Sequence, residues 1–118
     1  MKLAVAILIS GSGSNMVHLI KSMDDNHPAY PSVVISNNSD APGLEKAQFL
    51  GVPTEVINEN YVKDNDSEFE KELIKILKLY NVELICLAGF MKILSKKFVN
   101  NFKDRILNIH PSLLPKYK

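Results

Sequence analysis

The chain has 118 residues, the length of one domain or part of one. Hydrophobic residues make up 46% and charged residues 23%, which is typical of a globular protein and excludes a disordered chain. Fourteen lysines and arginines face thirteen acidic residues. The charge therefore predicts neither a nucleic-acid partner nor a membrane surface, and any anion site must be local.

The sequence also limits metal, redox and membrane chemistry. The single cysteine, Cys86, excludes an internal disulfide and a cysteine-based zinc site. A reducing cytoplasm fits this cysteine usage. No apolar run approaches the ~18 residues of a membrane span.

Short apolar runs alternate with helical patterns along the chain. The runs predict strands at residues 3–9, 33–35, 56–57, 84–88 and 106–110. Most of these runs are continuous, as expected of strands covered on both faces. A first helix is predicted by the spacing of four apolar residues, Met16, Leu19, Ile20 and Met23.

Three further helices are predicted from their capping signals. Asp40 is expected to cap a short helix that Gly51 stops. Ser67 and Glu70 predict a capping box for a helix over residues 67–80. Ser95 is expected to cap a short helix through residue 102. The strand–helix order predicts an α/β fold, a Rossmann-like parallel sheet with helices on both faces.

The loop after the first strand has the composition of an anion site. It reads Ser-Gly-Ser-Gly-Ser-Asn over residues 10–15 and leads into a helix, whose free N–H groups and positive dipole end favour an anion. A dinucleotide fingerprint would need a third glycine where Met16 stands and an acidic residue after the second strand. We therefore expect a single phosphate on Gly13, Ser14 and Asn15; a glycine turn without a ligand is the alternative.

Two polar residues on the last predicted strand form a candidate catalytic pair. A period of two places Asn108 and His110 on one face. The amide can hold a developing oxyanion, and the imidazole can move a proton near neutral pH. Polar residues reaching solvent at a strand end are the alternative.

Three long motifs follow one another along the chain: AVAILISGSGSN at residues 4–15, LAGFMKILS at 87–95 and LNIHPSLLPKY at 107–117. Together they closely resemble the phosphoribosylglycinamide formyltransferase (glycinamide ribonucleotide transformylase) family. The resemblance implies a formyltransferase fold, with residues 1–118 forming the N-terminal nucleotide-binding domain.

The resemblance implies transfer of a formyl group from 10-formyltetrahydrofolate to the amine of 5'-phosphoribosylglycinamide in purine (IMP) biosynthesis. It places the ribonucleotide phosphate on Gly13, Ser14 and Asn15, and makes Asn108 and His110 catalytic, without a metal. It places folate beside Asn108 and the segment of Met91, Lys92, Ile93 and Leu94. The residues alone favour core packing for the three apolar members of that segment, beside an exposed Lys92.

The chain departs from the family's pattern in two places. Asp66 stands where the family usually has an arginine that contacts folate, and Lys63 is a candidate substitute. The chain also stops at Lys118, whereas the family continues to further strands and an aspartate that pairs with the catalytic histidine. A neighbouring carboxylate favours charged imidazole. We therefore expect this polypeptide alone to be weakly active or inactive, and its open fifth strand to invite self-association as a homo-oligomer.

Two other interpretations stay open at the level of sequence. The same fold could serve another folate-dependent formyltransferase, acting on an amino-sugar nucleotide or on methionyl-tRNA. The chain could instead be a noncatalytic phosphate-binding fragment.

Overall fold

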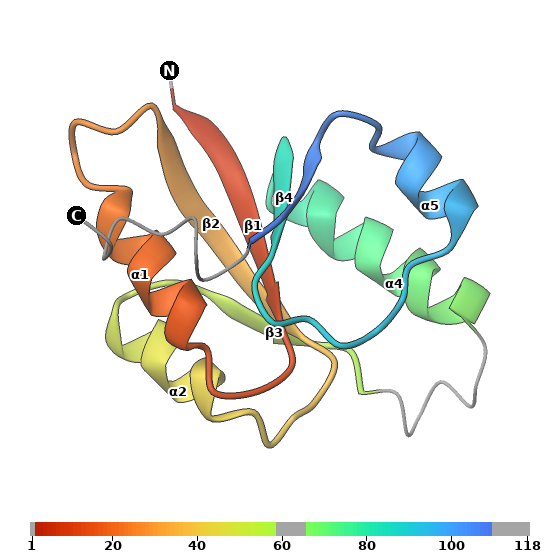
Figure 1. Cartoon of the computed structure of the whole chain (residues 1–118), viewed down its shortest axis with the longest axis horizontal. Coiled ribbons are helices and arrows are strands. Elements are labelled where there is room, and N and C mark those ends of the chain that lie inside the picture. Colours follow the sequence, from red (N-terminus) through yellow and green to blue (C-terminus); the bar gives the residue numbers. More distant parts are fainter. Residues whose placement is uncertain (1, 59–65, 110–118) are drawn as a thin grey trace.

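The computed structural model of the chain describes residues 2–58 and 66–109 (Figure 1). Five parallel strands form one sheet in the order β3-β2-β1-β4-β5. Their bounds are β1 (Leu3–Ile9), β2 (Ala29–Ser36), β3 (Thr54–Val56), β4 (Leu84–Leu87) and β5 (Ile106–Asn108). The helices are α1 (Ser14–Ser22), α2 (Pro42–Phe49), α4 (Asp66–Leu79) and α5 (Lys96–Asn101). The predicted α/β fold with an all-parallel sheet is confirmed.

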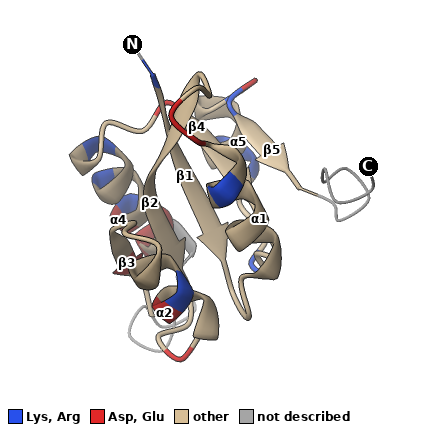
Figure 2. Cartoon of the chain, turned by 90° about the vertical axis from the view of Figure 1, so that its left-hand side faces the viewer, with Lys and Arg blue, Asp and Glu red and all other residues tan. Residues whose placement is uncertain are grey.

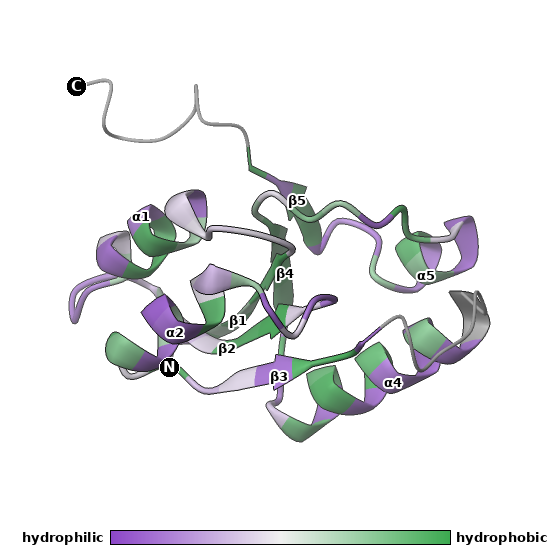
Figure 3. Ribbon diagram, turned by 90° about the horizontal axis from the view of Figure 1, so that it is seen from below, coloured by the Kyte–Doolittle hydropathy of each residue, from purple (hydrophilic) through white to green (hydrophobic). Residues whose placement is uncertain are grey.

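Helices cover both faces of the sheet, with α1 and α2 on one side and α4 and α5 on the other (Figure 3). The central strand supplies both cores because its side chains alternate between the faces. Val5, Ile7 and Ile9 pack with α1 and α2, whereas Ala6 and Leu8 pack with α4 and α5. The continuous apolar run of β1 is thus explained by burial on both faces.

Charged side chains lie on the helices, on the connections and, at Glu55, on β3, whereas β1 and β2 carry none (Figure 2). Within residues 2–58 and 66–109, no helix is both long and apolar enough to cross a membrane. The longest described helix, α4, has only 14 residues.

β2 begins earlier than its apolar run predicts. Residues 29–31 also pair with β1, and the register shifts between Val5, opposite Pro31, and Ala6, opposite Val33. Proline lacks an N–H donor, so it is accommodated at such an irregularity. The prediction of residues 33–35 was too short because it counted only consecutive apolar residues.

Two predicted helix starts were wrong. α2 begins at Pro42 with Ala41 as its N-cap and no capping side chain, because proline is well suited to the first helical position. Asp40 therefore lies outside the cap. α4 begins at Asp66, so Ser67 is already inside the helix. Both carboxylate oxygens of Glu70 accept hydrogen bonds from Ser95. The side chain of Ser67 lies outside what the structure describes, so the capping box stays a prediction.

The other capping predictions are confirmed. Ser95 caps α5 and accepts a hydrogen bond from the Phe98 N–H. α2 ends before Gly51, which has a positive φ of 81°.

Candidate active site

The candidate site lies where the carboxyl ends of β1 and β4 meet. β1 connects through α1 to β2 on one side and pairs with β4 on the other, so the order of connections reverses between β1 and β4. In open parallel sheets, ligands bind in the crevice at this switch point. A cavity of about 230 Å³ occupies it, lined by residues 10–15 from the loop after β1 and by Ala88, Gly89 and Met91 from the segment after β4.

The loop after β1 is built from backbone rather than from side chains. Gly13 is the N-cap of α1, with a positive φ of 75°, so no side chain closes the helix start. The first N–H groups of a helix have no carbonyl partner within it, and they are available to an anion here. Ser14 is exposed and Asn15 is half-buried at the same place.

The start of α2 packs directly against this loop. The Gly43 N–H donates to the Gly11 carbonyl at 3.0 Å. A Cβ at Gly13 would lie 2.8 Å from the Gly43 Cα, so only hydrogen fits there. The Lys46 Nζ of the same helix donates to the Ser12 carbonyl at 2.9 Å. α2 thus fixes the loop from behind and brings one cation to it.

The segment after β4 leaves two large apolar side chains in solvent. Met91 is 79% exposed and Ile93 is 89% exposed. The expectation from the residues alone, that they pack in the core, was therefore wrong for both. Of the three residues expected in the core, Leu94 alone packs, partly buried, against the core beneath α4 and α5, where Phe90 also packs. Exposed apolar groups beside a cavity are suited to a flat, apolar ligand.

The same segment is anchored at several points. The Ala88 N–H donates to the Leu8 carbonyl at 2.9 Å, and the Met91 N–H donates to the Ser10 Oγ at 2.8 Å. Lys92 is half-buried rather than exposed as expected, with its Nζ 4.9 Å from the centre of the Phe69 ring. That distance is within the range of a cation–π contact.

Glu70 holds the far end of the segment. Its carboxylate is buried and accepts from the Ser95 N–H at 2.7 Å and from the Ser95 hydroxyl at 2.6 Å. Charge-assisted hydrogen bonds of this length are strong. The two ends of the segment are therefore held, while the side chains of Met91 and Ile93 are exposed.

Asn108 lies at the same edge of the sheet. It is the last residue of β5, pairs in register with Leu87, and is exposed. Ile106, two residues earlier, packs on the side of α4 and α5, so Asn108 shares that face. His110 lies outside the described residues, as does Lys63, and the side chain of Asp66 is not described either. The pairing of Asn108 with His110 stays a prediction.

Cys86 lies on β4, buried against α1 and α2. Burial raises the pKa of its thiol, which keeps the sulfur protonated and unreactive. Among residues 2–58 and 66–109, no three His, Cys, Asp or Glu side chains gather as a metal site would require.

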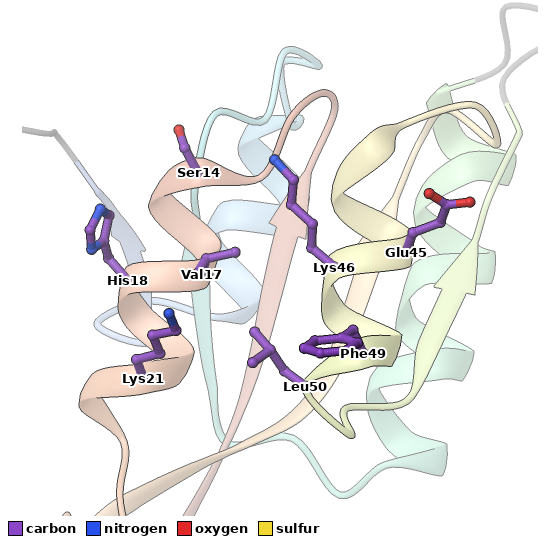
Figure 4. Close-up of a pocket in the computed structure, with 8 residues that line it drawn as sticks. All are labelled: Ser14, Val17, His18, Lys21, Glu45, Lys46, Phe49 and Leu50. Atoms are coloured by element: carbon purple, nitrogen blue, oxygen red, sulfur yellow. The ribbon is translucent and has the colours of Figure 1, made fainter.

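A larger cavity of about 630 Å³ lies between α1 and α2 (Figure 4). Its lining includes Val17, Leu50 and the 91% exposed Phe49, with Lys21 and Lys46 at the rim. Only Ser14 belongs to both cavities. We place the site in the smaller cavity because it alone joins the loops at the strand ends, where the predicted site residues Gly13, Ser14, Asn15 and Met91 come together.

Sequence reasoning missed Glu70 and Gly43 as parts of this site. Glu70 was assigned to a helix cap because a serine lies three residues earlier, and its partner Ser95 is 25 residues away. Gly43 was not noticed because its neighbour Gly13 comes 30 positions earlier in the chain.

The fold and this site define an α/β protein with a glycine-rich loop at the switch point of a parallel sheet. The family described as formyl transferase matches residues 3–118, and the chain belongs to that family.

Several known proteins resemble this chain closely. The human trifunctional purine biosynthetic protein adenosine-3 is 47% identical over 118 residues, which cover 99% of this chain and 12% of that protein. The phosphoribosylglycinamide formyltransferase of Escherichia coli is 41% identical over 114 residues, covering 96% of this chain and 53% of that protein. The crystal structure of phosphoribosylglycinamide formyltransferase from Brucella melitensis superposes with a TM-score of 0.88 at 39% identity, covering 98% of this chain and 60% of the other. The chain thus spans about half the length of the E. coli relative.

Proposed function

We propose that this chain transfers a formyl group from 10-formyltetrahydrofolate to the amine of 5'-phosphoribosylglycinamide, a step of purine biosynthesis. The observation that carries the proposal is the cavity at the switch point, because it joins the glycine loop to the segment after β4. The names of the similar proteins support the same reaction. Cytoplasmic location and a homo-oligomer formed through β5, an edge strand among the described ones, belong to the proposal.

The two substrates would approach from opposite sides of the sheet edge. The loop that leads into α1 would hold the ribonucleotide phosphate through Gly13, Ser14 and Asn15. Folate would lie on Met91, Lys92, Ile93 and Leu94, whose anchors are on the α4 side. Asn108 faces that same side. The reacting amine and the formyl carbon would therefore meet between β1 and β5.

For this reaction, the protein would need only to place polar groups beside the reacting atoms. The neutral amine attacks the formyl carbon, and the carbonyl oxygen becomes an oxyanion. The Asn108 amide would donate a hydrogen bond to that oxyanion. His110 would stabilise the same charge when protonated and assist proton transfer to the departing folate nitrogen. Direct attack by the amine needs neither a protein nucleophile nor a metal.

A formyl-transfer assay of the wild type and the Asn108→Ala variant tests the proposal. We expect Asn108→Ala to lower kcat about 100-fold, because one oxyanion donor is lost. Asn100→Ala is the matched control, since Asn100 is an exposed asparagine on α5. His110→Ala should also lower the rate, by about 100-fold or more. Equal rates for wild type and Asn108→Ala would remove Asn108 from the mechanism.

Calorimetry beside the assay separates the alternatives. Binding of 5'-phosphoribosylglycinamide in preference to an amino-sugar nucleotide or methionyl-tRNA supports the proposed substrate. Binding of both substrates without any turnover by wild type would favour a noncatalytic phosphate-binding fragment. The same measurement tests the expectation that this polypeptide alone is weakly active.

A further inference from the structure

Ser10 contacts the connections on both sides of the candidate site. It follows β1 directly and is half-buried. β1 lies between β2 and β4, so the connections that leave both neighbouring strands pass beside Ser10. The residue also immediately precedes the glycine loop that starts at Gly11.

The Ser10 hydroxyl makes two hydrogen bonds, one to each side. It donates to the Asn37 Oδ1 at 2.7 Å, just after β2. It accepts from the Met91 N–H at 2.8 Å, in the segment after β4. A hydroxyl has one donor and two acceptor positions, so both bonds can exist at once. Each bond polarises the other in such a chain.

The bond to Met91 lies in the middle of the segment, between Phe90 and Lys92, whose side chains contact the Phe69 ring. Ala88 is held by β1 and Ser95 is held by Glu70, with the exposed Met91 and Ile93 between them. The Met91 N–H donates its hydrogen bond to the Ser10 hydroxyl. Loss of the hydroxyl would leave that N–H to water and loosen the middle of the segment.

We propose that Ser10 is a positioning residue that couples the glycine loop to the segment after β4, so that a bound phosphate compound tightens folate binding. This inference rests on the proposed function, because it assigns phosphate to the loop and folate to the segment. A ligand that orders the loop also orders Ser10 and, through its hydroxyl, the Met91 N–H. The ordering cost of the second ligand is then smaller, which is positive coupling.

Coupling between two sites is reciprocal and can be measured from either ligand. We expect ribose 5-phosphate, used as the phosphate probe, to tighten 10-formyltetrahydrofolate binding roughly fivefold or more, the lower end of common coupling factors. Ribose 5-phosphate lacks the reacting amine, so no transfer occurs during the titration.

The test compares wild type with Ser10→Ala, Ser10→Thr and the control Ser22→Ala. Ser22 is an exposed serine on α1 whose hydroxyl donates to the Leu19 carbonyl at 2.7 Å, far from the site in the fold. We expect Ser10→Ala to reduce the coupling factor to within about twofold of one. Ser10→Thr, which keeps the hydroxyl, and Ser22→Ala should retain the coupling.

Amide hydrogen exchange without ligands gives a second readout. Exchange at the Met91 N–H should accelerate in Ser10→Ala and stay unchanged in Ser22→Ala. If Ser10→Ala does not fold, Asn37→Ala replaces it, because it removes the acceptor of the Ser10 hydroxyl and should weaken the coupling. Unchanged coupling in whichever of these two variants folds would overturn the inference.

The outcomes separate the inference from the proposed function. If wild type binds both probes without coupling, the inference fails and the proposed function stands. If wild type binds neither probe, the proposed function fails and the inference fails with it. Coupling that is lost in Ser10→Ala and kept in Ser10→Thr supports both.

Discussion

The two loops that line the candidate site are built in opposite ways. The loop after β1 is held by the close backbone contact of Gly13 with Gly43, and it presents backbone N–H groups to the cavity. The segment after β4 has its backbone fixed by side chains, Ser10 and Glu70, and offers the exposed side chains of Met91 and Ile93. A small anion needs converging donors, whereas a large flat ligand needs apolar area. The difference between the loops therefore matches the difference between the two proposed substrates.

The largest expected effect tests whether close packing fixes the first loop. Gly13→Ala should lower the free energy of unfolding by about 3 kcal/mol, because it combines a left-handed backbone with an overlap onto Gly43. Gly51→Ala is the control: its φ is also positive, but nothing lies within 4 Å of the added Cβ. That variant should cost about 1–2 kcal/mol, from the backbone alone. Urea unfolding measures both, and equal costs would show that the contact with Gly43 does not matter.

The next effect tests the anchor of the second loop. Glu70→Ala should cost about 2 kcal/mol, because the buried Ser95 bonds to a charged group are lost. Glu72→Ala should cost less than about 0.5 kcal/mol, since its carboxylate is exposed and pairs with Lys75 at 3.9 Å. Urea unfolding compares the two, and hydrogen exchange at the Ser95 N–H localises the change. A cost for Glu70→Ala as small as that for Glu72→Ala would contradict the anchor.

The smallest expected effect on stability tests what the exposed side chains are for. Ile93→Ala should change the unfolding free energy by less than about 0.5 kcal/mol, because a surface side chain makes few contacts. It should nevertheless weaken 10-formyltetrahydrofolate binding by roughly tenfold, about 1.4 kcal/mol of lost apolar contact. Leu79→Ala, at a 70% exposed leucine on α4, should alter neither quantity. Unchanged folate affinity in Ile93→Ala would separate this segment from folate.

Local patterns predicted the fold well because the main elements are encoded by neighbouring residues. The run over residues 3–9 predicted β1 with its true bounds, since a strand buried on both faces is apolar throughout. The cap at Ser95 was also right. The prediction that Asp40 caps α2 was wrong because Pro42, two positions later, is better suited to the first helical position.

The site was harder to predict because its contacts join distant parts of the chain. Ser10 was seen as part of a loop, but its partners lie 27 and 81 positions away. Because Met91 and Ile93 are hydrophobic, residue type alone predicted that they are buried, yet both are exposed. Only the resemblance to a formyltransferase placed them at a ligand, which stays a proposal.

The parallel direction of all five strands separates the two ends of the molecule. Lys2 precedes β1 and Ser10 follows it, and seven strand residues span about 23 Å. A fluorophore or surface tether attached beside Lys2 would therefore leave the candidate site facing away from the support. Immobilised or labelled protein prepared in this way should report binding without steric interference.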